Sequence, residues 1–147
     1  WWCLEHVSNP LAVLCRIHEL LRPGGTCLLG VRNIASFNAR VFGDKWYHLD
    51  CPRHLYLYSP DTIGRLVKAA GLALEGIAFD RGTRGLMRSL RYRFGDDTTP
   101  LASQHNPAGW RLLKILATPW TSLLAVCGQA DLMVAHARKP DVTEERR

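Results

Sequence analysis

Residues 20–31 read LLRPGGTCLLGV, and this short stretch contains both the end of a helix and the start of a strand. Pro23 cannot continue a helix, and Gly24 or Gly25 accepts the left-handed conformation that ends one. The apolar run 26–31 follows without polar alternation, which is typical of a strand buried on both faces inside a parallel sheet. The stretch therefore predicts a helix, a tight turn and a buried strand, in that order.

Helices and strands alternate on both sides of this turn. Upstream, Asn9 can cap a helix, Pro10 suits its first turn, and apolar residues at spacings of three and four continue to Leu21. Downstream, Ser59 can cap a second helix, and Pro60 suits the first turn of that helix. The same reading predicts further helices over residues 86–94 and 110–127, the latter kinked or divided at Pro119, and further strands over residues 73–79 and 130–137. This alternation predicts an α/β fold in which helices cover a sheet.

Composition fits one compact globular domain. The chain has 147 residues, of which 47% are hydrophobic and 22% charged. The apolar run 112–127 contains Lys114 and Pro119 and is too short to span a bilayer. Five cysteines without a Cys-x-x-Cys pair indicate reduced thiols, and no signal-peptide pattern follows Trp1, so we expect a cytoplasmic protein. Because the chain opens with Trp instead of Met, we also expect a piece of a longer reading frame.

The formal net charge of +6 is concentrated in the second half of the chain. Basic residues from Arg81 to Arg93 precede the apolar helix predicted over 110–127, so residues 81–127 are the basis of an alternative function as a basic module that binds RNA or an anionic membrane surface. The sequence lacks interleaved aromatic and basic residues, which argues against nucleic acid as a partner. We favour a solvated arginine face and a helix packed on the sheet, while peripheral membrane contact stays open.

Residues 32–58 lack clean periodicity and are dense in polar and aromatic side chains. A long irregular segment inside a small domain is typical of a binding loop or lid.

Five short motifs occur along the first 60 residues in a characteristic order. They are Leu4-Glu5-His6-Val7, Leu20-Leu21-Arg22-Pro23-Gly24-Gly25, Asn33-Ile34-Ala35-Ser36, Gly43-Asp44-Lys45-Trp46-Tyr47-His48 and Pro52-Arg53-His54-Leu55-Tyr56. Together they closely resemble the class I S-adenosylmethionine-dependent methyltransferases, in particular the bacterial enzymes that act on small molecules.

This resemblance implies a partial Rossmann-like sheet with flanking helices. The family sheet has the strand order 3-2-1-4-5-7-6, with the seventh strand antiparallel. Residues 1–7 would be the end of strand 4, and residues 26–31, 73–79 and 130–137 would be strands 5, 6 and 7. Residues 1–138 would form the C-terminal part of the methyltransferase domain, and residues 139–147 a charged tail.

The cofactor implied by the resemblance is S-adenosylmethionine, bound in the intact parent protein. The family's glycine-rich turn after strand 1 and its ribose-binding acid after strand 2 have no counterpart in the sequence. We therefore expect the isolated chain to be inactive, to bind the cofactor poorly and to be poorly stable. The partner would be a small-molecule methyl acceptor whose reacting atom, oxygen, nitrogen or carbon, stays open.

Ligands of open α/β sheets bind beyond the carboxyl ends of the strands, which places the candidate site after strands 4 and 5. The resemblance implies that Glu5, His6 and Val7 flank the cofactor. The residues expected to bind the substrate are Asn33, Ser36, Trp46, Tyr47, Arg53 and Tyr56. The candidates for a catalytic base are His54, then His48, then His6.

Each of these roles has a structural alternative. His54 would otherwise buttress the second helix, Arg53 would tie the loop to the body, and Trp46 and Tyr47 would pack the lid.

A zinc site is a further alternative, because Cys3-x-x-His6 and Cys51-x-x-His54 offer four ligands. Such pairs are much less common than Cys-x-x-Cys, and the methyltransferase resemblance already accounts for both histidines. We therefore predict no metal.

Overall fold

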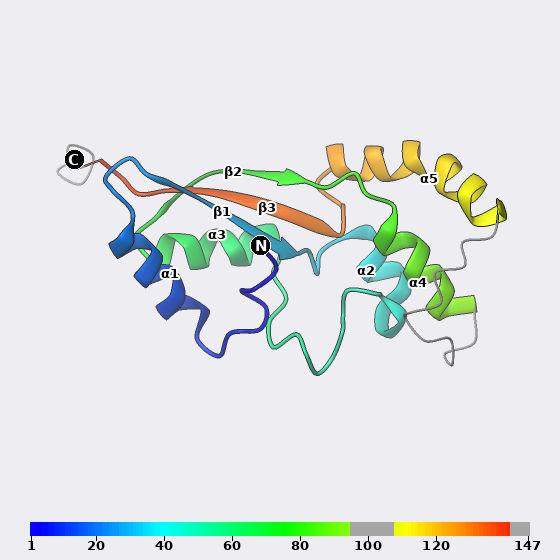
Figure 1. Cartoon of the computed structure of the whole chain (residues 1–147), viewed down its shortest axis with the longest axis horizontal. Coiled ribbons are helices and arrows are strands. Elements are labelled where there is room, and N and C mark those ends of the chain that lie inside the picture. The colour runs from blue at the N-terminus through cyan, green and yellow to red at the C-terminus, as the bar shows by residue number, and fades with distance from the viewer. Residues whose placement is uncertain (95–107, 142–147) are drawn as a thin grey trace.

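A computed structural model describes residues 1–94 and 108–141 as a twisted sheet with helices around it (Figure 1). The sheet consists of β1 (Thr26–Arg32), β2 (Ala73–Phe79) and β3 (Leu132–Arg138) in the order β1-β3-β2. The central strand β3 is antiparallel to both neighbours, so β1 and β2 run in the same direction. This order corresponds to strands 5, 7 and 6 of the expected sheet, and the α/β fold class is confirmed.

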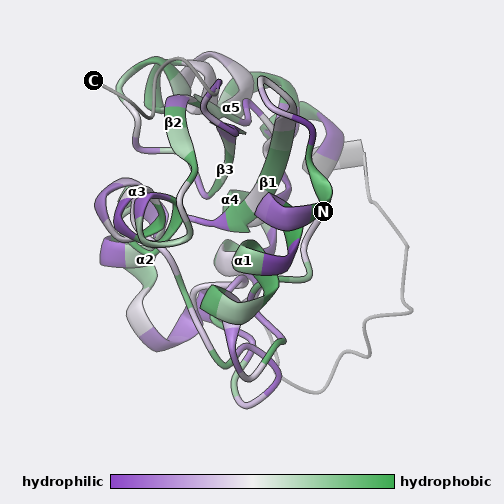
Figure 2. Ribbon diagram, turned by 90° about the vertical axis from the view of Figure 1, so that its left-hand side faces the viewer, coloured by the Kyte–Doolittle hydropathy of each residue, from purple (hydrophilic) through white to green (hydrophobic). Residues whose placement is uncertain are grey.

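Two helices cover one face of the sheet and enclose the main core. They are α1 (Pro10–Leu20) and α3 (Pro60–Ala69), and they lie on the same side of the strands in Figures 1 and 2. Both begin as the sequence predicts: the Asn9 side chain accepts a hydrogen bond from the Ala12 N–H, and Ser59 forms a capping box with Thr62. The fully buried members of this core are Leu14, Val31, Ile63, Val67, Met133, Ala135 and Ala137.

The remaining helices gather near the carboxyl ends of β1 and β2. These are α2 (Phe37–Phe42), the 3-10 turn η1 (Gly43–Lys45), α4 (Arg84–Phe94) and α5 (Ala108–Val126), all toward the right of Figure 1. A second small core of Ala39, Phe42 and Trp46 joins α2 and η1 to α4. The segment 32–58, expected to be irregular, therefore contains two short helical elements.

Residues 1–7 do not form the strand expected of them. The Trp2 N–H donates to the Gly30 carbonyl at 3.1 Å, so the segment does lie beside β1, where strand 4 of the family would run. A turn closed by the His6 N–H and the Cys3 carbonyl, 3.0 Å apart, then bends the chain away before a ladder develops. The sheet of the described residues thus has three strands.

Three further expectations need correction. The first half of β1 is not buried, because Leu28 is 48% exposed on the face opposite α1 and α3, and the partner strand is antiparallel. Pro119 does not divide α5, which continues through it. Lys139, at the start of the expected charged tail, is held by its Nζ group, which donates to the His18 carbonyl at 2.9 Å. The loop expected over 95–107 and the end of the tail lie outside the described residues.

Candidate functional site

Three segments meet at the carboxyl end of β1, namely residues 4–8, 32–36 and 53–58. The Leu55 N–H donates to the Glu5 carbonyl at 2.8 Å, and the Ile34 N–H donates to the Tyr58 carbonyl at 2.9 Å. The Tyr58 hydroxyl donates to the Leu4 carbonyl at 3.1 Å. The structure therefore brings together the segments that the sequence analysis expected at the candidate site from the strand-end rule and the family resemblance.

Glu5 is fully buried beneath this meeting point. Its Oε1 atom accepts from the Arg32 N–H at 3.1 Å and lies 3.5 Å from Arg32 Nη1. Its other oxygen has no hydrogen-bond partner. Burial, followed by the negative charge of Glu5, raises the pKa of the neighbouring Tyr58 hydroxyl well above its usual range. The carboxylate of Glu5 thus faces the end of β1 and is not open to a ligand.

His6 and His54 form a pair of imidazole rings whose centroids lie 4.9 Å apart. His6 Nδ1 lies 2.9 Å from the Arg53 carbonyl, and His54 Nδ1 lies 2.9 Å from the His48 carbonyl. Because a carbonyl oxygen only accepts hydrogen bonds, both neutral rings are assigned a proton on Nδ1 and a lone pair on Nε2. The Nδ1 hydrogen bonds therefore fix the orientation of both rings.

Asp131, at the start of β3, organises the segment that follows β1, and the sequence analysis did not identify it. Its Oδ1 atom accepts from Ser36 Oγ at 2.9 Å and from Trp46 Nε1 at 3.0 Å. Its Oδ2 atom accepts from Asn38 Nδ2 at 2.9 Å. Burial raises the pKa of Asp131, and these three hydrogen bonds oppose that rise. The sequence feature that could have indicated this role is an acidic residue directly before an apolar strand.

Two of the predicted substrate residues serve this anchoring. Asn33 is fully buried, and its Nδ2 group donates to the Ala130 carbonyl at 2.9 Å. Ser36 is also fully buried, caps α2 and donates to Asp131. Through these buried hydrogen bonds, both side chains anchor the segment that follows β1.

His48 lies inside the same region with its ring edge-on to Trp46 and Tyr47. Burial lowers the pKa of His48 to about 3, and positive charges that include Arg32 add to the effect. Its Nε2 atom is buried without a partner, next to Gly85 of α4. His48 is therefore uncharged at neutral pH and is a poor proton acceptor.

A small cavity of about 280 Å³ opens beside this region. Its lining includes three of the predicted substrate residues, Trp46, Tyr47 and Arg53. The other lining residues are Asp44, Leu49, Asp50, Cys51 and Tyr92. The cavity thus combines aromatic walls with charged groups, which suits a small ring-shaped molecule that carries polar substituents.

Arg53 and Tyr56, two of the predicted substrate residues, each have a partner within the protein. Arg53 is mostly exposed and pairs with Asp50 at 2.9 Å. Tyr56 lies outside the cavity, where its hydroxyl donates to the Ser8 carbonyl at 3.1 Å.

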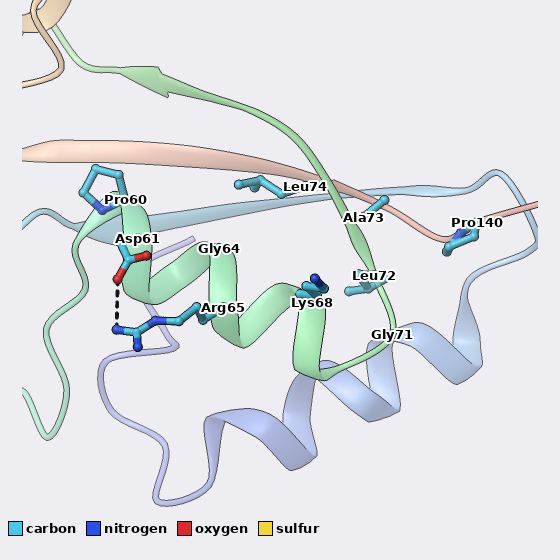
Figure 3. A pocket seen from close by; sticks show the side chains of 10 residues that line it. All are labelled: Pro60, Asp61, Gly64, Arg65, Lys68, Gly71, Leu72, Ala73, Leu74 and Pro140. Atoms are coloured by element: carbon cyan, nitrogen blue, oxygen red, sulfur yellow. Dashed lines mark ion pairs between the residues drawn. The ribbon is translucent and has the colours of Figure 1, made fainter. Parts of the chain in front are cut away.

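A wider hollow of about 740 Å³ runs along α3 and the first residues of β2 (Figure 3). Its polar lining includes Asp61 and Arg65, which form an ion pair on the helix, together with Lys68. None of the predicted site residues lines it, and it extends toward the amino end of β2, the edge of a sheet where ligands of this fold class do not bind. We therefore place the candidate site at the smaller cavity.

The part of the chain that the structure describes contains neither a cluster of metal ligands nor a membrane-spanning helix. Within residues 1–94 and 108–141, no group of three or more His, Cys, Asp and Glu side chains is arranged to hold a metal ion. In the same ranges, no helix is both long and apolar enough to cross a membrane.

Comparison with known proteins defines the class of this fold and site. A family model described as a methyltransferase domain matches residues 1–76, and the chain belongs to that family. This match confirms the resemblance to class I S-adenosylmethionine-dependent methyltransferases.

The relatives with curated names are ubiquinone biosynthesis O-methyltransferases. The protein from Cereibacter sphaeroides strain ATCC 17029 is 36% identical over 75 residues, which are 47% of this chain and 30% of the relative. The protein from Chromobacterium violaceum is 30% identical over 104 residues, 65% of this chain and 42% of the relative. The chain thus spans less than half the length of these relatives.

A similar solved structure supports the fold. A protein described as a sarcosine dimethylglycine methyltransferase from Galdieria sulphuraria superimposes with a TM-score of 0.50 over 95% of this chain and 51% of its own, at 14% identity. No comparison lends support to the alternative of a basic interaction module as the function of the chain.

Proposed function

We propose that the protein to which this chain belongs transfers a methyl group from S-adenosylmethionine to a hydroxyl group of a small-molecule acceptor. The observation that carries the proposal is the family match over residues 1–76, because those residues include all three segments that meet at the end of β1. The choice of oxygen as the acceptor atom rests on the O-methyltransferase names of the curated relatives.

The residues at the end of β1 fit one wall of a cofactor site. His6 is exposed and Val7 half-buried, so these two residues would contact the cofactor. Glu5 would act indirectly, because its carboxylate is bonded to Arg32 and holds the segment against β1. When bound, S-adenosylmethionine supplies an electrophilic methyl group.

The acceptor would occupy the cavity lined by Trp46, Tyr47 and Arg53. Methyl transfer is an in-line displacement, so most of the rate enhancement comes from holding the acceptor oxygen on the axis of the breaking bond. Trp46, which lines the cavity, donates to the buried Asp131, and a wall fixed in this way is suited to such positioning. Arg53 would orient an acidic or hydroxyl substituent of the acceptor.

His54 is our candidate for the base that takes the acceptor proton. Its Nδ1–H is held by the His48 carbonyl, which leaves Nε2 as the accepting atom. His6, whose ring lies beside it, is the alternative. His48 itself would serve as a positioning residue, because its low pKa prevents it from holding a proton at neutral pH.

A chimera tests this proposal. Residues 1–76 would replace the matching segment of the Cereibacter sphaeroides relative, and transfer of radiolabelled methyl groups from S-adenosylmethionine to a catechol would be measured. We expect transfer, and we expect His54→Gln to lower kcat by about 10²-fold or more with little change in KM for the cofactor. His18→Gln is the control, because His18 belongs to the transplanted residues and lies at the end of α1 beside Gly71, away from the three segments. A folded chimera without transfer would refute the methyltransferase proposal, and an unaffected His54→Gln variant would refute the role of His54.

A further inference from the structure

The helix α5 leaves much of its apolar surface exposed. Its buried residues are Thr121, Leu124 and Ala125, and the Thr121 hydroxyl donates to the Arg81 carbonyl at 3.0 Å. The side turned away from the body is apolar. We call this side the outer stripe, and its members are Leu112, Ile115, Leu116, Leu123 and Val126.

The spacing of the outer stripe matches one face of a helix, with intervals of three, four and seven residues. Its side chains are strongly exposed, from 53% at Leu123 to 76% at Val126. Single exposed apolar residues are ordinary on a protein surface, but a continuous stripe along a whole helix marks an interaction surface. Figure 1 shows α5 at the rim of the molecule, at the opposite end from the carboxyl end of β3.

The charged side chains of α4 and α5 are all positive. α5 contains Arg111 and Lys114, and its sequence has no acid. The neighbouring helix α4 contains four arginines and also lacks an acid. Arg111, Lys114, Arg84 and Arg91 are exposed. A second copy of this chain would present charges of the same sign, whereas an anionic lipid surface presents the opposite sign.

We propose that α5 docks on an anionic membrane surface, with the outer stripe inserted among the lipid chains and the basic residues of α4 and α5 at the headgroups. An apolar face beside basic side chains is the composition of helices that lie in the plane of the membrane interface. Trp120, which flanks the outer stripe and is 43% exposed, is of the residue type that prefers this interface.

Co-sedimentation of the 147-residue chain with vesicles provides the test. We expect binding to vesicles of equal parts phosphatidylglycerol and phosphatidylcholine, and much weaker binding to phosphatidylcholine alone. Each of Arg111→Gln and Lys114→Gln should lower binding to the anionic vesicles about fivefold. Added salt should weaken it further.

A matched pair of leucine variants distinguishes binding through the outer stripe from nonspecific binding through any exposed apolar side chain. Leu116 is 66% exposed on the stripe, and Leu20 is 69% exposed at the end of α1. We expect Leu116→Gln to lower binding about tenfold and Leu20→Gln to leave it unchanged. Equal behaviour of the two variants, or no sedimentation of the wild-type chain with anionic vesicles, would overturn the proposal.

Two further measurements test self-association through the stripe and membrane insertion of the wild-type chain. Light scattering that shows a dimer of the wild-type chain and a monomer of Leu116→Gln, without vesicle binding, would assign the stripe to a second copy and refute the membrane proposal. If Leu116→Gln does not fold by circular dichroism, quenching by brominated lipids is measured on the wild-type chain and on Trp120→Phe. Insertion predicts quenching that the Trp120→Phe variant loses, and equal quenching in both proteins contradicts it.

Discussion

At the scale of single residues, two buried acids hold the candidate site together, and both act through backbone or side-chain donors of another segment. Glu5 is tied to the end of β1 through the Arg32 N–H, and Asp131 is tied to three donors that follow β1. Burying a carboxylate without donors is costly, so Asp131 requires its three donors, and Glu5 requires the Arg32 N–H and guanidinium beside its Oε1 atom.

Replacing Asp131 by asparagine should destabilise the protein. An amide in place of the carboxylate removes one acceptor and leaves at least one of the donors Ser36, Asn38 or Trp46 buried without a partner. We expect the free energy of unfolding to fall by about 2–4 kcal/mol, measured by urea denaturation. Asp61→Asn, which breaks an exposed ion pair with Arg65, is the control and should cost less than about 1 kcal/mol. Similar losses in both variants would contradict an anchoring role for Asp131.

His48 should make the free energy of unfolding fall as the pH is lowered. Its pKa is lowered to about 3 in the folded protein, mainly by burial, and returns to about 6.5 on unfolding. The unfolded chain therefore binds more protons as the pH falls, so the contribution of His48 is complete above pH 6.5 and is lost toward pH 3. From pH 7 to pH 5 this loss is roughly 2 kcal/mol.

Urea denaturation of the wild type and of His48→Asn at these two pH values measures the effect. The wild type should lose more stability than the variant. The raised pKa of Asp131 acts in the opposite direction, favouring the folded state at acid pH, but it is present in both proteins and cancels in the comparison. A parallel decline of the two proteins would show that His48 is not held uncharged.

At the scale of the elements, the helices divide into those that the local sequence specifies and those that depend on their contacts. α1 and α3 begin at side-chain caps whose partners lie three residues away, so the chain carries their start signals itself. α4 instead fits against the site through Gly85, where an added methyl group would meet Asp131 Oδ2 and His48 Nε2. Its position therefore depends on the absence of a side chain.

Two helical glycines should respond in opposite ways to alanine. Gly85→Ala places its Cβ against buried polar atoms and should lower the free energy of unfolding by about 1–3 kcal/mol, although alanine favours a helix. Gly109 in α5 has no neighbouring atoms within 4 Å, so Gly109→Ala should be neutral or stabilising by up to about 1 kcal/mol. Thermal unfolding of both variants provides the measurement, and stabilisation by Gly85→Ala would contradict the close contact.

At the scale of the whole molecule, the three described strands correspond to strands 5, 7 and 6 at one end of the methyltransferase family sheet. β1 pairs with β3 on one side, and on the other side it accepts backbone hydrogen bonds from Trp2 at Gly30 and from Tyr58 at Arg32 but has no partner strand among the described residues. The methyltransferase family match covers the residues along this open side, but the chain spans only 30% of the length of the first curated relatives. An exposed strand edge is a site of association, so this edge is where further strands would add.

The 147-residue chain alone should bind S-adenosylmethionine weakly, with a Kd above the micromolar range. The sequence has no glycine-rich turn to bring the backbone close to the cofactor, and one wall at His6 and Val7 buries too little of the ligand. Isothermal titration calorimetry measures this affinity, with the full-length Cereibacter sphaeroides relative as the positive control. Micromolar binding to the chain alone would show that these residues form a sufficient site.

The sequence by itself determined what depends on near neighbours and on motifs. The caps and apolar spacing of α1 and α3, the turn before β1 and the family motifs in residues 1–76 all specified structure or class directly. These signals are readable because their interacting partners lie within about one helical turn or within one contiguous pattern.

Only the tertiary structure decided what depends on distant partners. Asp131 bonds to residues 85 to 95 positions away, and no local pattern reveals such a contact. Residues 1–7 do not become a strand because a strand needs a ladder and the turn at Cys3 and His6 ends the pairing after one bond. The sequence predicted an apolar helix packed on the sheet, and only the packing of Thr121 and Leu124 showed that much of the apolar surface of α5 points outward.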